Sequence, residues 1–215
     1  MGREMSDIIK INTQTNSFQK VERPLTIAQY KEQGKWPFDF ISGKGLVNVI
    51  NQLSNRLSRN VVGLEIGICK GENIVHFLEQ TNRIDKIHCI DPYLPYMDWV
   101  GPVTQEDMNL WYEITMQNFA PHMDKIVVYK ETSGNCVNKF EDEMFDYIFI
   151  DGDHSYEGVL KDLNNYYSKV QSGGIFSGHD INLGTVQQAL RDFRSANNID
   201  NEMSFTNVNV WYWVK

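Results

Sequence analysis

The feature that most constrains the fold is a regular alternation of short apolar runs and amphipathic segments from residue 61 onward. The apolar runs, each expected to form a strand, cover residues 61–67, 86–91, 125–131, 145–151 and 173–180. Helical periodicity follows three of them, in residues 72–80, 156–170 and 186–196. Short strand and helix units of this kind favour a parallel sheet with right-handed crossovers, so the sequence predicts an α/β layered fold.

Two segments, residues 1–45 and residues 92–112, lie outside this rhythm. Residues 46–57 are expected to form a helix that leads into the first strand. Residues 203–215 hold two β-prone runs, which predict a hairpin around residues 207–209 and antiparallel character at one edge of the sheet. Residues 92–112, "PYLPYMDWVGPVTQEDMNLWY", are rich in Tyr, Trp and Pro and are interpreted as an aromatic loop that walls a ligand above the strand ends. Alternatively, these aromatic side chains seal the edge of the core.

The chain is long enough for one full core. It has 215 residues, of which 41% are hydrophobic, so we expect a single domain over residues 46–215. Residues 1–45 carry several Pro and Gly residues and one aromatic cluster, "KWPFDF". We interpret this first segment as a lid over the substrate or as a contact in a homo-oligomer.

The overall charge narrows the possible partners. A net charge of -8 argues against nucleic acid, whose phosphate backbone is bound by clustered Lys and Arg. The apolar runs are too short to span a bilayer, so no membrane contact is expected. Cys69, Cys89 and Cys136 form neither a CxxC pair nor an even set, which favours a reducing, cytoplasmic location.

The first predicted strand ends in the sequence "GLEIGICKGEN". Glu65, Gly67 and Gly71 would lie at the strand end, in the turn and at the start of the next helix. The spacing is GxxxG rather than the dinucleotide fingerprint GxGxxG, and a carboxylate at Glu65 would repel a pyrophosphate. The turn therefore suits a ligand that is cationic at this point, unless the two glycines serve only a tight turn.

The second predicted strand ends at Asp91, 24 residues after Gly67. A carboxylate at this position can accept hydrogen bonds from both hydroxyls of a ribose, although an Asp before Pro can equally cap the following loop. Asp91 and Glu65 together predict that the ligand is a nucleoside attached to a positively charged group.

The fourth and fifth predicted strands end in acidic residues and histidines. Asp151, Asp153 and His154 follow the fourth strand, and His179 and Asp180 end the fifth. Because parallel strands meet at one edge, these side chains are expected to gather there. Asp153 is interpreted instead as a cap of the next helix.

Four motifs in order, "LEIGICKGEN", "CIDPY", "FDYIFIDGDHSYEGVLKDL" and "GGIFSGHDI", resemble those of class I S-adenosylmethionine-dependent methyltransferases. Residues 60–215 are most similar to the small-molecule branch that includes the macrocin and mycinamicin sugar O-methyltransferases. The resemblance implies a Rossmann-like, doubly wound, mostly parallel seven-stranded sheet with an antiparallel C-terminal hairpin.

The resemblance also assigns cofactor contacts. Glu65 and Gly67 would line the methionine end of S-adenosylmethionine, Asp91 would hold its ribose, and Thr132 and Ser133 would lie near its adenine. Gly71 and Asp151 complete the predicted cofactor-binding set.

In the sugar O-methyltransferases, an Asp-x-x-His motif supplies a magnesium ligand and a general base, and a later acidic pair supplies further ligands. Asp151 and His154 match that motif here, whereas His179 and Asp180 replace the acidic pair. The implied ion is Mg²⁺ or Mn²⁺ on Asp151, His179 and Asp180. An imidazole ligand favours manganese, iron or zinc over magnesium, so His179 could also stay outside the shell, or His154 could act without a metal.

The leading hypothesis is an enzyme that methylates a hydroxyl of a small molecule, such as a sugar or a glycosylated metabolite. His154 would remove the hydroxyl proton, and Asp151 and Asp180 would hold the ion. A metal-dependent hydrolase built on Asp151, His154 and Asp180 is one alternative. An NAD(P)-dependent oxidoreductase is another, although its glycine fingerprint is missing. A non-catalytic binding protein is the third.

Overall fold

The computed structural model describes residues 8–12, 17–21, 32, 45–98, 101–206 and 208–215. The chain divides into two compact units, Met1–Trp36 and Pro37–Lys215. The aromatic cluster at 35–40, Trp99 and Asn207 lie outside the described residues. The lid or oligomer role of residues 1–45 therefore stays a prediction.

In the first unit, the described residues 8–12 and 17–21 form an antiparallel hairpin. Strand β1 (Ile8–Asn12) pairs with β2 (Ser17–Val21), with Ile8 opposite Val21 and Asn12 opposite Ser17.

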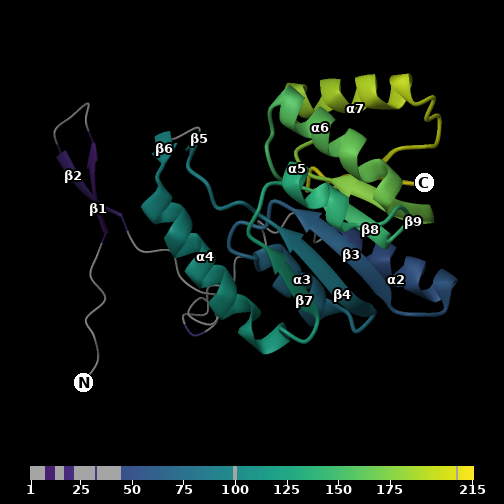
Figure 1. The fold of residues 1–215 in the computed structure, drawn as a ribbon, viewed down its shortest axis with the longest axis horizontal. Helices are drawn as coiled ribbons and strands as arrows, with labels where there is room; N and C mark the ends of the chain where they lie inside the picture. Colours follow the sequence, from purple (N-terminus) through teal and green to yellow (C-terminus); the bar gives the residue numbers. More distant parts are fainter. Residues whose placement is uncertain (1–7, 13–16, 22–31, 33–44, 99–100, 207) are drawn as a thin grey trace. The chain divides into compact units, whose positions relative to one another are not determined.

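The second unit is built on a seven-stranded sheet in the order β10-β11-β9-β8-β3-β4-β7 (Figure 1). Its strands are β3 (Val61–Ile66), β4 (Ile84–Ile90), β7 (Ile126–Tyr129), β8 (Phe145–Ile150), β9 (Val170–Gly178), β10 (Ser204–Phe205) and β11 (Trp211–Val214). The pairs from β7 to β9 are parallel, and β11 is antiparallel to both β9 and β10. The predicted doubly wound sheet with an antiparallel terminal hairpin is confirmed.

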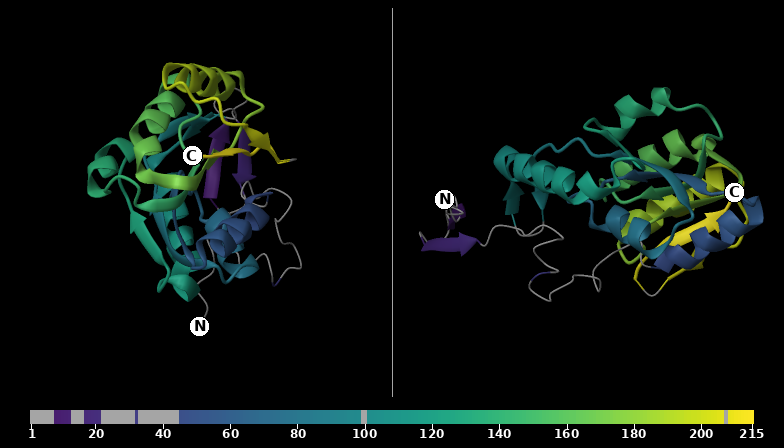
Figure 2. Two further views of the ribbon diagram at one scale, coloured as in Figure 1. Left: turned by 90° about the vertical axis from the view of Figure 1, so that its right-hand side faces the viewer. Right: turned by 90° about the horizontal axis from the view of Figure 1, so that it is seen from below.

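Helices cover both faces of this sheet (Figures 1 and 2). The helices are α2 (Val47–Leu57), α3 (Glu72–Gln80), α4 (Gln105–Phe119), α5 (Ser133–Cys136), α6 (Tyr156–Tyr166) and α7 (Gly184–Ala196). Helices α6 and α7 pack on the face that carries Leu64 and Ile148, where a large apolar cluster forms. Helix α3 lies on the other face, where its Phe77 ring contacts Tyr147. Successive side chains of a strand thus point to opposite faces of the sheet and pack against different helices.

The order of the strands creates a switch point between β3 and β8. From β3 the chain moves outward through β4 to β7, and it then returns to β8 on the other side of β3. In open sheets of this kind, ligands bind outside the carboxyl ends of the strands at the switch point. The residues just after Ile66 and Ile150 occupy that position.

Residues 92–112 do not form the predicted loop. They contain a short hairpin, β5 (Tyr96–Asp98) with β6 (Gly101–Val103), and the first half of α4. A capping box between Thr104 and Asp107 begins the helix. Apolar periodicity did not predict α4 because the buried side of this helix includes the polar residues Thr115 and Asn118.

Among the described residues, no helix combines the length and apolar character needed to cross a membrane.

Candidate active site

The turn after β3 depends on two glycines with left-handed backbones. Gly67 has φ of 82°, and a Cβ atom there would lie 2.0 Å from the carbonyl oxygen of Asp151. Gly71 has φ of 77°, and its Cβ would lie 2.4 Å from the ring of Phe119. Glycine is therefore required at Gly67 for the ends of β3 and β8 to approach each other, and at Gly71 for the turn to pack against Phe119 of α4. Whether these glycines also contact a cofactor stays a prediction.

Glu65 lies behind this turn. Its side chain is 1% exposed, and Asn73 Nδ2 donates a hydrogen bond of 2.8 Å to Glu65 Oε2. Burial, together with the nearby Asp151 carboxylate, raises the pKa of Glu65 well above its usual range. The predicted contact of Glu65 with the cofactor remains a prediction.

Asp91 organises the same turn from β4. Its Oδ2 accepts hydrogen bonds from the backbone N–H groups of Ile68 and Cys69, at 3.1 and 3.0 Å, and its Oδ1 accepts one from Tyr93 at 2.9 Å. Burial raises the pKa of Asp91 against the opposing effect of these hydrogen bonds. Asp91 thus fills the loop-capping role considered above, while its Oδ1, which accepts a single hydrogen bond, keeps a lone pair with which it could accept a ribose hydroxyl.

Thr132 and Ser133 form the turn after β7. Thr132 caps α5 by accepting a hydrogen bond of 3.3 Å from Asn135 N–H. The Ser133 hydroxyl donates to Asp162 Oδ1 on α6 at 2.5 Å, and Tyr166 OH donates to the Ser133 carbonyl oxygen at 2.7 Å. Helix α6 therefore holds this turn at two points.

Four predicted catalytic and metal residues converge at the carboxyl ends of β8 and β9. Asp180 lies between the two histidines, with Oδ2 3.0 Å from His154 Nε2 and Oδ1 3.2 Å from His179 Nδ1. Asp151 Oδ1 lies 3.4 Å from His154 Nε2 and 3.6 Å from His179 Nδ1. One ligand atom each from Asp151, His154 and Asp180 lies within 4.8 Å of the others, close enough for one ion.

The two histidines are held differently. His179 Nε2 donates a hydrogen bond of 2.9 Å to the Val208 carbonyl oxygen, so only its Nδ1 faces the carboxylates. His154 is held through its backbone, because Thr185 Oγ1 donates to its carbonyl oxygen at 2.7 Å. The His154 side chain is 40% exposed and that of His179 is 21% exposed.

The local backbone turns these side chains toward each other. Asp180 has φ of 57°, a left-handed conformation that a non-glycine residue adopts at some cost. Ser155 caps α6 by accepting from Gly158 N–H, and Asp153 Oδ1 accepts from Ser155 N–H at 2.8 Å. Asp153 thus supports the start of the helix, although the cap itself is Ser155.

The charges of the cluster are strongly coupled. Burial opposes ionisation of Asp151, but hydrogen bonds with His154 and His179 outweigh it and hold the pKa of Asp151 below its usual value. The hydrogen bond to Asp151 raises the pKa of His154. Burial lowers the pKa of His179, yet Asp151 and Asp180 together raise it to about 10. Two carboxylates thus create a site that attracts positive charge.

Sequence reasoning missed three supporting residues, Asn73, Asp162 and Val208. Asp162 stood in the recognised motif, but only the fold shows that it lies beside Ser133. The Val208 contact is made by a backbone atom and leaves no signal in the residue type.

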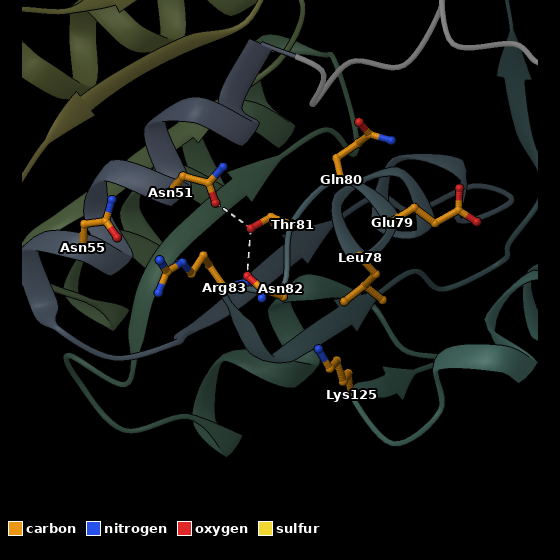
Figure 3. A pocket seen from close by; sticks show the side chains of 9 residues that line it. All are labelled: Asn51, Asn55, Leu78, Glu79, Gln80, Thr81, Asn82, Arg83 and Lys125. Carbon is orange, nitrogen blue, oxygen red and sulfur yellow. Dashed lines mark hydrogen bonds between the residues drawn. The ribbon is translucent and has the colours of Figure 1, made fainter.

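A groove of about 640 Å³ lies elsewhere, at the amino ends of the strands (Figure 3). Its polar lining includes Asn51, Asn55, Thr81, Arg83 and Lys125. Arg83 immediately precedes β4 and Lys125 immediately precedes β7, so this groove lies at the opposite end of the sheet from the cluster. The convergence of acid and imidazole groups identifies the candidate active site better than cavity size does.

Similar proteins agree with the fold. The O-methyltransferase NovP matches with a TM-score of 0.60 and 16% identity, over 79% of this chain and 78% of that chain. An O-methyltransferase from Bacillus cereus, in complex with SAH, matches with a TM-score of 0.56 and 14% identity, over 88% and 89%. Spermidine synthase from Thermotoga maritima matches with a TM-score of 0.52 and 18% identity, over 81% and 58%. No curated protein sequence gives a significant match.

A match to a protein-family model shows which family the chain belongs to. The profile described as "Methyltransferase domain" matches residues 64–181, which is more than half of the chain. This match includes the turn after β3, Asp91 and the cluster at Asp151, and it favours a methyltransferase over a hydrolase or an oxidoreductase. The chain belongs to this methyltransferase domain family, as a class I S-adenosylmethionine-dependent enzyme.

Proposed function

We propose that this enzyme transfers a methyl group from S-adenosylmethionine to a hydroxyl of a small molecule, specifically a sugar or a glycosylated metabolite. The observation that carries the proposal is the convergence of Asp151, His154, His179 and Asp180 beside the turn after β3. A hydroxyl is a poor nucleophile until its proton is removed, and this cluster offers a base for that purpose. The O-methyltransferases among the structural neighbours support the same acceptor chemistry.

S-Adenosylmethionine supplies the methyl group, which bonds to the acceptor oxygen as its bond to sulfur breaks. Glu65 and the glycine turn would lie near its methionine end, Asp91 near the ribose, and Thr132 and Ser133 near the adenine. These positions lie at or just after the carboxyl ends of β3, β4 and β7, which are adjacent strands. The Asp151 carboxylate, whose pKa is held below its usual value, suits a ligand whose sulfonium carries positive charge.

His154 is proposed as the general base. It is the more exposed of the two histidines, and its Nε2 lies at the cluster beside Asp180. His179 is less suited to this role, because its Nε2 is bonded to Val208 and its Nδ1 faces the two carboxylates. The carboxylates also stabilise the imidazolium that His154 becomes when it takes the proton.

Asp151, His179 and Asp180 are proposed to hold a divalent ion, and the group whose ligand atoms lie within 4.8 Å of one another is Asp151, His154 and Asp180. Neighbouring ligands of a six-coordinate ion lie about 3 Å apart when each is about 2.1 Å from the metal. His179 Nδ1 lies 3.6 Å from Asp151 Oδ1 and 3.2 Å from Asp180 Oδ1. A mixed oxygen and nitrogen set favours Mn²⁺ over Mg²⁺. When bound, such an ion would lower the pKa of an acceptor hydroxyl and orient it.

Calorimetric titration of the metal-stripped protein with S-adenosylhomocysteine tests the cofactor part of the proposal. We expect micromolar binding that weakens at least about 10-fold in Asp91→Ala, since that variant loses the acceptor for a ribose hydroxyl and the shape of the turn. Asp85→Ala, an exposed position on the same strand, is the matched control. Failure of the wild-type protein to bind would overturn the proposed function.

Methyl transfer to a panel of sugars and glycosides tests the acceptor part. With any acceptor that is methylated, His154→Gln should lower kcat by about 10² to 10⁴ while S-adenosylhomocysteine affinity stays unchanged. An unchanged kcat would remove His154 from the role of base.

A further inference from the structure

His154 lies in a short segment whose backbone is held by few bonds. Residues 152–154 connect β8 to the cap of α6, and within the described part of the chain no hydrogen bond between backbone groups joins them to other residues. The His154 ring lies 3.4 Å from Asp151 and 3.0 Å from Asp180, but its side chain is 40% exposed. The position of this imidazole therefore depends on what fixes the backbone of His154.

His179, the other histidine of the cluster, is held at three points. Its backbone N–H donates to the Ile150 carbonyl oxygen at 3.0 Å, and its carbonyl oxygen accepts from Trp211 Nε1 at 3.0 Å. Its ring donates to the Val208 carbonyl oxygen, as described above. Among the described residues, by contrast, a single side chain bonds to the backbone of His154, and it belongs to Thr185.

Thr185 reaches His154 from the first turn of α7. It is the second residue of that helix, and its Oγ1 donates to the His154 carbonyl oxygen at 2.7 Å. The bond is exposed, so water can take the place of the hydroxyl as a donor, and loss of the bond should change the stability of the fold little. The main effect of the Thr185 hydroxyl is therefore on where the backbone of His154 lies.

A second bond joins the same two helices. Tyr156 OH on α6 donates to Asp192 Oδ2 on α7 at 2.9 Å (Figure 1). Tyr156 is only two residues from His154, but its bond fixes one helix on the other without contacting the His154 carbonyl oxygen. The two bonds thus allow the packing of α6 on α7 to be separated from the placement of His154.

We propose that Thr185 is a positioning residue for proton transfer, which holds the His154 imidazole where it can take the proton of an acceptor hydroxyl. Thr185 acts through the backbone of His154 and neither gives nor takes a proton in the reaction. Displacement of a reacting group by about 1 Å can cost about 10²-fold in rate, so the loss of one such bond has a measurable effect. The inference rests on the proposed role of His154 as general base.

The first test is the kcat of methyl transfer by the full-length protein. Thr185→Val keeps the shape of the side chain but loses the donor, and it should lower kcat about 10- to 100-fold. The KM of the acceptor and the dissociation constant of S-adenosylhomocysteine should stay within about 2-fold, and the melting temperature within about 2 °C. Thr185→Ser keeps the donor and should stay within about 3-fold of the wild-type kcat. Tyr156→Phe, which breaks the other bond between α6 and α7, is the matched control and should also stay within about 3-fold.

Two further measurements separate positioning from a general structural role. In the His154→Gln background, Thr185→Val should change kcat by less than about 2-fold, because the base that Thr185 positions is already gone. Labelling of histidines with diethyl pyrocarbonate at pH 7.5 needs no acceptor. Followed by peptide mass spectrometry, the His154 ring should react about 3-fold faster in Thr185→Val, since its segment opens more readily, and at the wild-type rate in Tyr156→Phe.

Failure of the inference differs from failure of the proposed function. If the wild-type protein methylates an acceptor and Thr185→Val keeps its kcat, or Tyr156→Phe loses as much, the inference is wrong and the proposed function stands. An equal loss from Thr185→Val with and without His154 would also overturn the inference. If the wild-type protein neither binds S-adenosylhomocysteine nor methylates an acceptor, the proposed function fails, and the catalytic part of the inference fails with it. An unchanged labelling rate in Thr185→Val would show that Thr185 does not hold His154 at all.

Discussion

The Nε2 atom of His179 lies 2.9 Å from the carbonyl oxygen of Val208, and this contact determines which ring nitrogen faces the acidic cluster. Because a carbonyl only accepts, the Nε2 proton is committed to Val208. The Nδ1 atom is then either protonated between Asp151 and Asp180 or free to ligate an ion. Metal-binding histidines commonly have their other N–H held in this way.

Exchange of His179 should therefore weaken metal binding. We expect His179→Asn to raise the dissociation constant for Mn²⁺ at least about 10-fold, measured by electron paramagnetic resonance of free Mn²⁺ during a titration at pH 7.5. His122→Asn, which changes a histidine far from the cluster in sequence, is the control and should bind as the wild-type protein does. Equal affinity in all three proteins would place His179 outside the coordination shell.

Removal of the Tyr147 hydroxyl should stabilise the fold. Its oxygen is buried without a hydrogen-bond partner, whereas the buried Tyr166 hydroxyl donates to Ser133. An unsatisfied buried hydroxyl costs about 1 to 3 kcal/mol, so Tyr147→Phe should raise the free energy of unfolding by about 1 kcal/mol. Tyr166→Phe should lower it by about 1 kcal/mol. Urea unfolding measures both, and a loss of stability in Tyr147→Phe would contradict the expectation.

Asp162→Asn should make the protein more stable at neutral pH. Burial raises the pKa of Asp162 from 3.8 to about 6, so folding opposes its ionisation. The resulting penalty is absent below about pH 4, grows as the pH rises toward 6, and is complete above that value. The gain in unfolding free energy should be about 1 to 3 kcal/mol at pH 7.5.

The pH dependence identifies the cause of that gain. The difference between Asp162→Asn and the wild-type protein should disappear as the pH falls from about 6 to 4, because Asp162 is then neutral in both states of the wild-type chain. Urea unfolding at several pH values follows this difference. A difference that does not change with pH would point to packing instead of charge.

Loss of the Asp146 carboxylate should destabilise the opposite end of the sheet. Asp146 is 2% exposed and accepts from Arg59 at 2.6 and 2.7 Å, from Val62 N–H at 2.7 Å and from Gln171 at 2.6 Å. Asp146→Ala leaves these donors unpaired and should cost about 2 to 4 kcal/mol. Arg59→Ala should cost about 1 kcal/mol or less, since Arg59 is half exposed and Asp146 keeps its other donors. Equal costs in urea unfolding would contradict this assignment.

The strands and most helices could be predicted because each is a local pattern. The runs that became β3 and β8 are apolar and short, and α6 and α7 repeat their buried positions at helical spacing. Helix α4 could not be predicted in this way, because its Thr115 and Asn118 are buried and form hydrogen bonds with the turn after β3. The buried polar side chains of α4 find their hydrogen-bond acceptors, the carbonyl oxygens of Cys69 and Lys70, only in the folded protein.

The candidate site was predictable in its residue types but not in its connections. Parallel strands bring their ends to one edge, so Asp151, His154, His179 and Asp180 could be expected to meet. The hydrogen bond to Val208 involves a carbonyl that every residue possesses, and the partnership of Ser133 with Asp162 joins positions 29 residues apart. Contacts of this kind depend on the tertiary fold rather than on a motif.

The contact between His179 and Val208 also has a consequence for the order in which the site is completed during synthesis. Val208 follows Asp151 by 57 residues, and at about 5 to 20 residues per second the ribosome needs several seconds to bridge that interval. During those seconds, Asp151 and His154 have been made while the segment that fixes His179 has not. A nascent chain thus contains Asp91 and Asp151 for several seconds before the carbonyl that holds His179 has been made.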